Sequence, residues 1–134
     1  MSKRYIDANI ALRYLTGEPH DLAEQAKAEL EEPAVLSMEI LNEIVYVLEN
    51  AKTIEEDGSQ HPRYAKQSVA ELLIRFSQVV DYEPYDLMLY ALRLHREQPN
   101  LDIADCELIA RNHLKNDEVV TFDKRLQKRL LQVG

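Results

Sequence analysis

The sequence is poor in the residues that mark disulfide-linked or membrane-spanning chains. It has no Trp, one Cys and three Gly among 134 residues. Because a single Cys cannot form an internal disulfide, we expect Cys106 to be a packed core thiol in a reducing compartment. No apolar run reaches the ~18 residues of a membrane span, and Asp7, Asn9 and Arg13 interrupt the stretch that a signal peptide would need. These absences predict a globular, cytoplasmic protein without a membrane segment.

Positive charge is also scarce, because 16 Lys and Arg face 24 Asp and Glu, for a net charge of -8. Proteins that hold nucleic acid by phosphate contacts alone carry a broad basic surface, so this balance argues against a passive nucleic-acid binder. It argues less against an enzyme whose divalent metal ions neutralise the site. One local basic strip comprises Lys124, Arg125, Lys128 and Arg129. The first three are candidates for contacts to a nucleic-acid backbone, and a solvated helix face is the alternative.

The length and the 46% hydrophobic content suit one compact domain over residues 1–134, with no repeat and no linker. Short apolar runs alternate with helical periodicity, and residues 53–62 are predicted to form a polar loop. Strands are expected at residues 3–6, 34–37, 79–82 and 118–122, with a fifth possible only at 130–134. Helices are expected at residues 8–16, 38–50, 63–77, 85–96, 102–114 and 124–131. This order predicts a three-layer α/β fold, with helices on both faces of a central parallel sheet of four to five strands.

Four acidic residues lie where the expected strands give way to helices. Asp7 and Asp123 directly follow strands, whereas Glu43 and Asp105 lie on the early turns of helices that begin at the same edge. Functional sites of parallel sheets lie beyond the carboxyl ends of the strands. Carboxylates gathered there repel one another, and oxygen ligands favour the hard ions Mg2+ or Mn2+. The pattern therefore predicts a carboxylate metal site.

Helix capping is the main alternative for these carboxylates. Asp7, Asp102 and Asp123 all stand at predicted helix starts, where Asp accepts hydrogen bonds from free N–H groups. Glu43 falls beside the apolar stripe of its helix, where an unpaired carboxylate is costly, so a salt bridge or an exposed position is its alternative. The four His residues have no metal-ligand spacing, and we expect surface or packing roles for them: His20, His61, His95 and His113.

Four segments, YIDAN, SMEILNE, DCELIA and TFDKRL, together resemble the PIN-domain family, and especially its VapC-type toxins of toxin–antitoxin pairs. The resemblance spans essentially the whole chain in the family's order. It implies a PIN-like fold and a Mg2+-dependent ribonuclease, with Mn2+ as a substitute ion. It also implies that a tetrad of carboxylates binds the metal and catalyses hydrolysis: Asp7, Glu43, Asp105 and Asp123.

The resemblance carries further expectations about neighbouring side chains and partners. Asn9, Ser37 and Thr121 would orient the carboxylates or a metal-bound water, and Asp102 could do the same while capping its helix. The implied partners are an RNA substrate, an antitoxin protein and a second copy of the chain. A catalytically inactive PIN-like interaction module remains open. A phosphoryl-transfer enzyme with Asp7 as nucleophile is disfavoured, because DAN lacks a second Asp two residues on.

Overall fold

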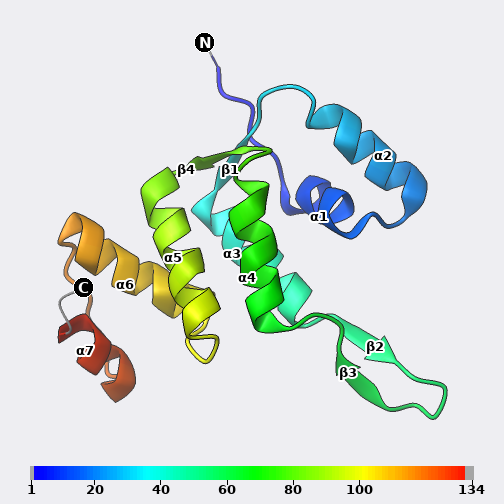
Figure 1. Cartoon of the computed structure of the whole chain (residues 1–134). Helices are drawn as coiled ribbons and strands as arrows, with labels where there is room; N and C mark the ends of the chain where they lie inside the picture. The colour runs from blue at the N-terminus through cyan, green and yellow to red at the C-terminus, as the bar shows by residue number, and fades with distance from the viewer. Residues whose placement is uncertain (1, 132–134) are drawn as a thin grey trace.

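The computed structural model describes residues 2–131, as an α/β arrangement of helices around a small parallel sheet (Figure 1). The helices are α1 (Ala8–Thr16), α2 (His20–Glu29), α3 (Met38–Glu49), α4 (Lys66–Phe76), α5 (Tyr85–Glu97), α6 (Ile103–Lys115) and α7 (Lys124–Leu131). The strands are β1 (Val35–Ser37), β2 (Lys52–Ile54), β3 (Gln60–Pro62) and β4 (Asp81–Glu83). None of the described helices has both the length and the apolar character that a membrane crossing requires.

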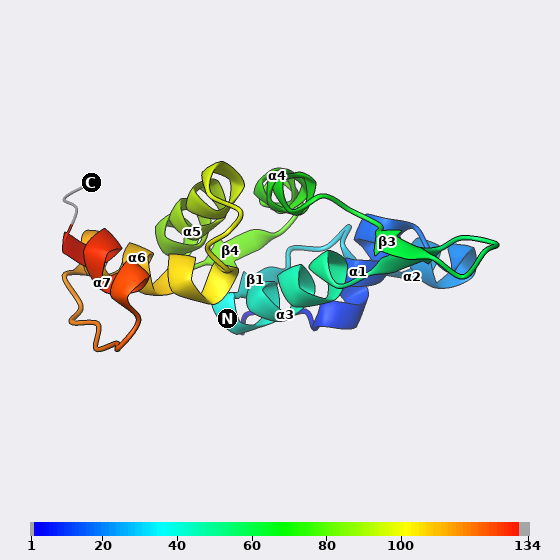
Figure 2. The ribbon, with the colours of Figure 1, turned by 90° about the horizontal axis from the view of Figure 1, so that it is seen from below.

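The parallel sheet lies between two layers of helices. Strands β1 and β4 pair in parallel, with Val35 opposite Asp81. Tyr5 adds a parallel bridge on the other edge of β1, where the Ile6 N–H donates to the Val35 carbonyl at 3.0 Å and the Val35 N–H donates to that of Arg4 at 2.9 Å. Helices α4 and α5 cover one face, and α1 and α3 cover the other (Figure 2). The expected helices on both faces of a parallel sheet are therefore present.

The sheet is smaller than the four to five strands that the sequence predicts. Within residues 2–131 it consists of β1, β4 and the single bridge at Tyr5. Residues 118–122, expected as a strand, pair with no other strand of the described chain, and Val120 and Phe122 are 85% and 97% exposed. β-propensity produces a strand only where the backbone finds a partner, and this segment joins α6 to α7 away from the sheet (Figure 1). Of the possible fifth strand, 130–131 belong to α7 and 132–134 lie outside the described residues.

A helix and a hairpin form in segments whose residues carry no clear periodic pattern. Helix α2 buries only Ala23 and Ala26, so its apolar face is too narrow to produce a visible helical period. The expected polar loop contains the antiparallel hairpin of β2 and β3, in which every strand residue is exposed. Its turn does follow the sequence signal, because Gly58 adopts a positive φ of 87° that favours glycine. A hairpin without a buried face has no alternation to reveal it.

The apolar side chains of α3 and the Cys106 thiol belong to the hydrophobic core, as expected. Leu41, Ile44 and Leu48 on α3 are at most 2% exposed, whereas Val47 on the same helix is 42% exposed. Cys106 on α6 is fully buried, and this burial raises the pKa of its thiol to about 12. The expectation of a packed core thiol is confirmed.

Tyr82 joins the sheet to α4 through a buried hydrogen bond. Its side chain on β4 is 3% exposed, and its hydroxyl donates to the Leu73 carbonyl in the last turn of α4. Carbonyls in the last turn of a helix lack their usual partner. We expect Tyr82→Phe to lower the free energy of unfolding by about 1–2 kcal/mol, measured by urea denaturation. Tyr85→Phe removes the hydroxyl of a 55% exposed residue and serves as the matched control; an equal loss there would contradict this role.

Candidate active site

Asp7 is held at the start of α1, immediately after the bridge to β1. One carboxylate oxygen, Oδ1, accepts the Ile10 N–H at 3.1 Å, so the side chain caps the helix. Asp7 is exposed, and Asn9 is exposed in the first turn of the same helix. The capping role that the sequence allowed for Asp7 is therefore present in the structure.

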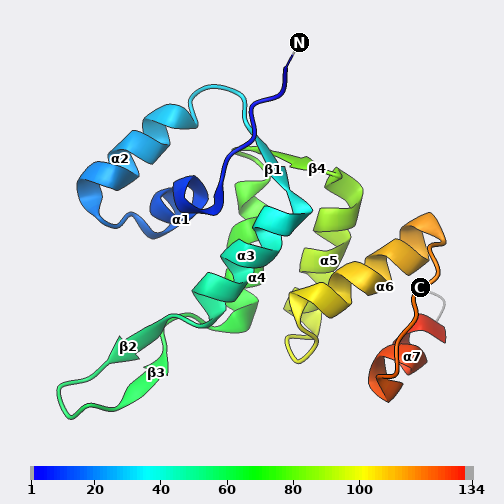
Figure 3. The same ribbon diagram turned by 180° about the vertical axis from the view of Figure 1, so that it is seen from behind.

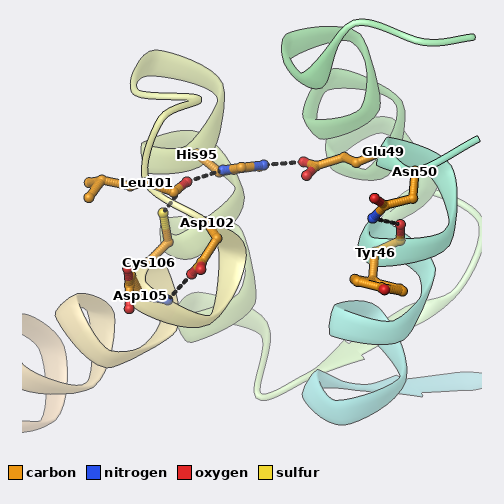
Figure 4. A network of polar contacts seen from close by, with 8 residues as sticks. All are labelled: Tyr46, Glu49, Asn50, His95, Leu101, Asp102, Asp105 and Cys106. Atoms are coloured by element: carbon orange, nitrogen blue, oxygen red, sulfur yellow. Dashed lines mark hydrogen bonds and ion pairs between the residues drawn. The ribbon is translucent and has the colours of Figure 1, made fainter. Parts of the chain in front are cut away.

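Asp102 and Asp105 occupy the first turn of α6 (Figure 4). Asp102 Oδ1 accepts the Asp105 N–H at 2.8 Å and caps the helix. Asp105 is half-buried, and its pKa is raised, first by loss of solvent and then by the negative charges of Asp102 and Asp123. The positive charge of Arg125 opposes this rise. Carboxylates from the starts of two different helices thus lie close enough to repel one another.

Asp123 precedes α7 and also bonds to helix N–H groups. Its Oδ1 accepts the N–H of Arg125 at 2.9 Å and that of Leu126 at 3.1 Å. Thr121 Oγ1 accepts the backbone N–H of Asp123 at 3.0 Å, so it positions the backbone of Asp123. The capping bonds of Asp102 and Asp123 both use Oδ1, which leaves the second oxygen of each carboxylate outside these bonds. Capping and cation binding are therefore compatible at these two residues.

Glu43 lies on α3, and Ser37 ends β1 directly before that helix. Glu43 is exposed, and Ser37 Oγ accepts the Ile40 N–H at 3.3 Å and caps the helix. Asn42, beside Glu43, donates to the Glu107 carboxylate on α6 at 3.0 Å. Helix α3 separates α1 from α6 and α7 in two views (Figures 2 and 3). The structure therefore couples Asp105 to Asp102 and Asp123, whereas α3 lies between α6 and α1, whose N-cap is Asp7 (Figure 3).

The grouping determines how well the residues fit a metal ion. Within residues 2–131, no three or more His, Cys, Asp or Glu side chains are arranged to hold one. The repulsion at Asp105 is what a bound cation would relieve, but neither Asp7 nor Glu43 is among the charges that raise its pKa. Among the described residues, the structure thus brings Asp105 within range of the charges of Asp102 and Asp123 without arranging three carboxylates around one ion.

A buried His–Glu pair supports the turn that leads into the acidic group (Figure 4). His95 on α5 is fully buried, and its Nδ1–H donates to the Leu101 carbonyl at 2.6 Å while Nε2 bonds to the Glu49 carboxylate of α3. Leu101 directly precedes Asp102, so the pair fixes the backbone where α6 begins. Burial lowers the pKa of His95, but the hydrogen bond and charge of Glu49 outweigh it, and the net shift is upward.

Sequence reasoning assigned His95 to surface or packing, and packing is confirmed, but the pair itself was missed. A signal existed, because His95 follows Met88 and Leu92 on the apolar face of α5 at helical spacing. A buried His needs a polar partner. The identity of that partner, Glu49, depends on the packing of α3 against α5 and has no local sequence signal.

The basic strip forms an exposed face of α7. Lys124, Arg125 and Lys128 are exposed, and the buried Leu126 anchors the helix to the core. The Arg125 guanidinium donates to the Asn100 carbonyl at 3.5 Å and acts on the charge of Asp105. A basic side chain of α7, Arg125, is therefore close enough to the carboxylate of Asp105 on α6 to interact with its charge.

Comparison with known proteins identifies the family but no individual relative. No curated protein and no solved structure matches the chain. The family model described as PIN domain matches residues 4–130, which include all four carboxylates of the expected tetrad. Because the match covers nearly the whole sequence, the chain belongs to the PIN domain family.

Proposed function

We propose that the protein is a metal-dependent endoribonuclease that hydrolyses RNA phosphodiester bonds, and the toxin of a VapBC-type pair. PIN domains are generally nucleases that act on RNA or DNA with divalent metal ions. The observation that carries the proposal is the repulsion among Asp102, Asp105 and Asp123 at the junction of α6 and α7. A half-buried carboxylate whose pKa is raised by loss of solvent and by other carboxylates is typical of functional sites.

The proposed catalytic residues are Asp7, Glu43, Asp105 and Asp123, with Mg2+ as the ion and Mn2+ as its substitute. Catalysis by all four requires Asp7 and Glu43 to approach Asp105 and Asp123, because α3 separates α1 from α6 and α7 (Figure 3). Supporting roles are proposed for Ser37, which holds the first turn of the helix that carries Glu43, and for Thr121, which holds the backbone of Asp123. Asp102 supports Asp105 in the same way.

The proposed partners follow from the toxin assignment. They are RNA, an antitoxin protein and a second copy of the chain, all in the cytoplasm. The net charge of -8 favours an antitoxin segment that is basic, because complementary charge steers association. A positively charged antitoxin segment could then neutralise the acidic group at α6 and α7.

A second candidate is a PIN-like interaction module without catalysis. The observation that favours it is the engagement of Asp7 and Asp123 in helix capping, with Glu43 exposed on α3. In such a module the carboxylates stabilise helix starts and need no metal ion.

Metal removal separates the two candidates. We expect the purified protein to cleave a mixed RNA pool in Mg2+, to lose cleavage in excess EDTA and to regain it with Mn2+, because carboxylate sites bind hard ions. The readout is fragment length and end chemistry, with 5′-phosphate and 3′-hydroxyl ends expected. Cleavage that persists in EDTA contradicts the metal mechanism. No cleavage of any RNA with either ion favours the interaction module.

A further inference from the structure

A pocket of about 500 Å³ lies between the turn that joins α5 to α6 and one face of α7. The turn contributes Gln98, Asn100 and Leu101 to its wall. Helix α7 contributes three cationic side chains, Arg125, Lys128 and Arg129. A volume of this size falls within the range of small-ligand sites, roughly 300–1,000 Å³.

The charge of this pocket is opposite to that of the whole chain. Its described lining holds three cations and one carboxylate, Glu97, in a protein of net charge -8. Of these cations, Lys128 is exposed, and Arg125 is exposed and also acts on the charge of Asp105. Arg and Lys are the side chains that most readily pair with phosphate oxygens. The pocket therefore favours an anionic ligand, and phosphate suits its cations best.

The pocket also borders the acidic group of the candidate active site. Leu101 in its wall directly precedes Asp102, and Arg125 is close enough to influence the pKa of Asp105. A phosphodiester held for cleavage at the carboxylates would therefore have a flanking nucleotide within reach of the cations. The amide side chains of Gln98 and Asn100 each offer a hydrogen-bond donor and an acceptor, which suits the edge of an unpaired base.

We propose that this pocket binds one nucleotide of single-stranded RNA next to the cleaved bond. Arg125 and Lys128 bind its phosphate, and Gln98 and Asn100 face its base. The choice of RNA rests on the proposed nuclease function, whereas the binding of a nucleotide rests on the size and charge of the pocket.

The test is nucleotide binding in the presence of EDTA, so that neither metal nor turnover contributes. The full chain is titrated with adenosine 5′-monophosphate in a calorimeter. The dissociation constant should be about tenfold higher for Lys128→Gln than for the unmodified protein, because a charged phosphate contact is lost. Lys52→Gln makes the same change in the exposed strand β2, outside the pocket lining, and should bind as the unmodified protein does. Inorganic phosphate should bind more weakly than the nucleotide.

Three results would overturn the pocket assignment: no nucleotide binding, equal losses for both Lys variants, or equal affinity for phosphate and nucleotide. RNA cleavage is scored separately. If the protein binds the nucleotide through Lys128 but cleaves no RNA, the pocket assignment stands and the proposed nuclease function is wrong. If it cleaves RNA but does not bind the nucleotide, the nuclease function stands and the pocket assignment is wrong.

Discussion

Replacement of Asp105 with Asn is expected to reduce RNA cleavage by about a hundredfold or more without lowering the stability of the fold. Loss of a metal-binding carboxylate removes most of the electrostatic stabilisation that a nuclease site provides. The stability should hold or rise, because the pKa of Asp105 is raised by lost solvent and by the charges of Asp102 and Asp123. A carboxyl with a raised pKa is less favourable to ionise in the folded state, and a neutral amide removes that cost at pH 7.

The measurements are initial cleavage rates in Mg2+ and the urea midpoint of the same preparations. Asp117→Asn is the matched control, because Asp117 follows the other end of α6 and is exposed. Glu39→Gln and Glu43→Gln form a second pair on α3, and only the latter should lose activity if Glu43 belongs to the site. Full activity of Asp105→Asn would remove this residue from the catalytic group.

The helices could be predicted because their starts and ends depend on local chemistry. The expected ranges 8–16 and 124–131 match α1 and α7. Asp7 caps α1, and Gly17 ends it with a positive φ of 70°, which a residue without a side chain adopts readily. The strand expected at 118–122 shows the limit of this reasoning. Its apolar residues favour an extended chain, but pairing depends on where α6 and α7 carry that segment.

The candidate site shows the same division between local and distant information. The sequence allowed capping for Asp7, Asp102 and Asp123, with metal binding expected of Asp7 and Asp123 and a supporting role of Asp102, and the structure shows the capping bonds. Whether the carboxylates also gather depends on the packing of helices far apart in the chain. The charge of Asp123, before α7, acts on Asp105 in α6, whereas Glu43 lies on α3. A local pattern identifies candidate ligands but does not fix their distances.

The largest loss of stability is expected for His95→Ala. The substitution empties a fully buried position and leaves the Glu49 carboxylate, 13% exposed, and the Leu101 carbonyl without their shared partner. Removal of one member of a buried ion pair costs about 3–5 kcal/mol. His61→Ala is the matched control, because His61 pairs with Glu55 in the exposed hairpin, where both side chains are more than half exposed. That exposed pair should contribute about 1 kcal/mol or less.

The same pair predicts how stability depends on pH. Both ring nitrogens of His95 face oxygen acceptors, the Leu101 carbonyl and the Glu49 carboxylate, so the doubly protonated ring is favoured and its pKa is raised in the folded state. The stabilisation is therefore fully present below the unfolded pKa of about 6.5 and is lost as pH rises through the higher folded value. Urea denaturation of the unmodified protein at a series of pH values should show this decline, and Glu49→Gln should remove it. A decline of equal size in Glu49→Gln would assign the effect to other groups, and the turn before Asp102 would then be held without a charged histidine.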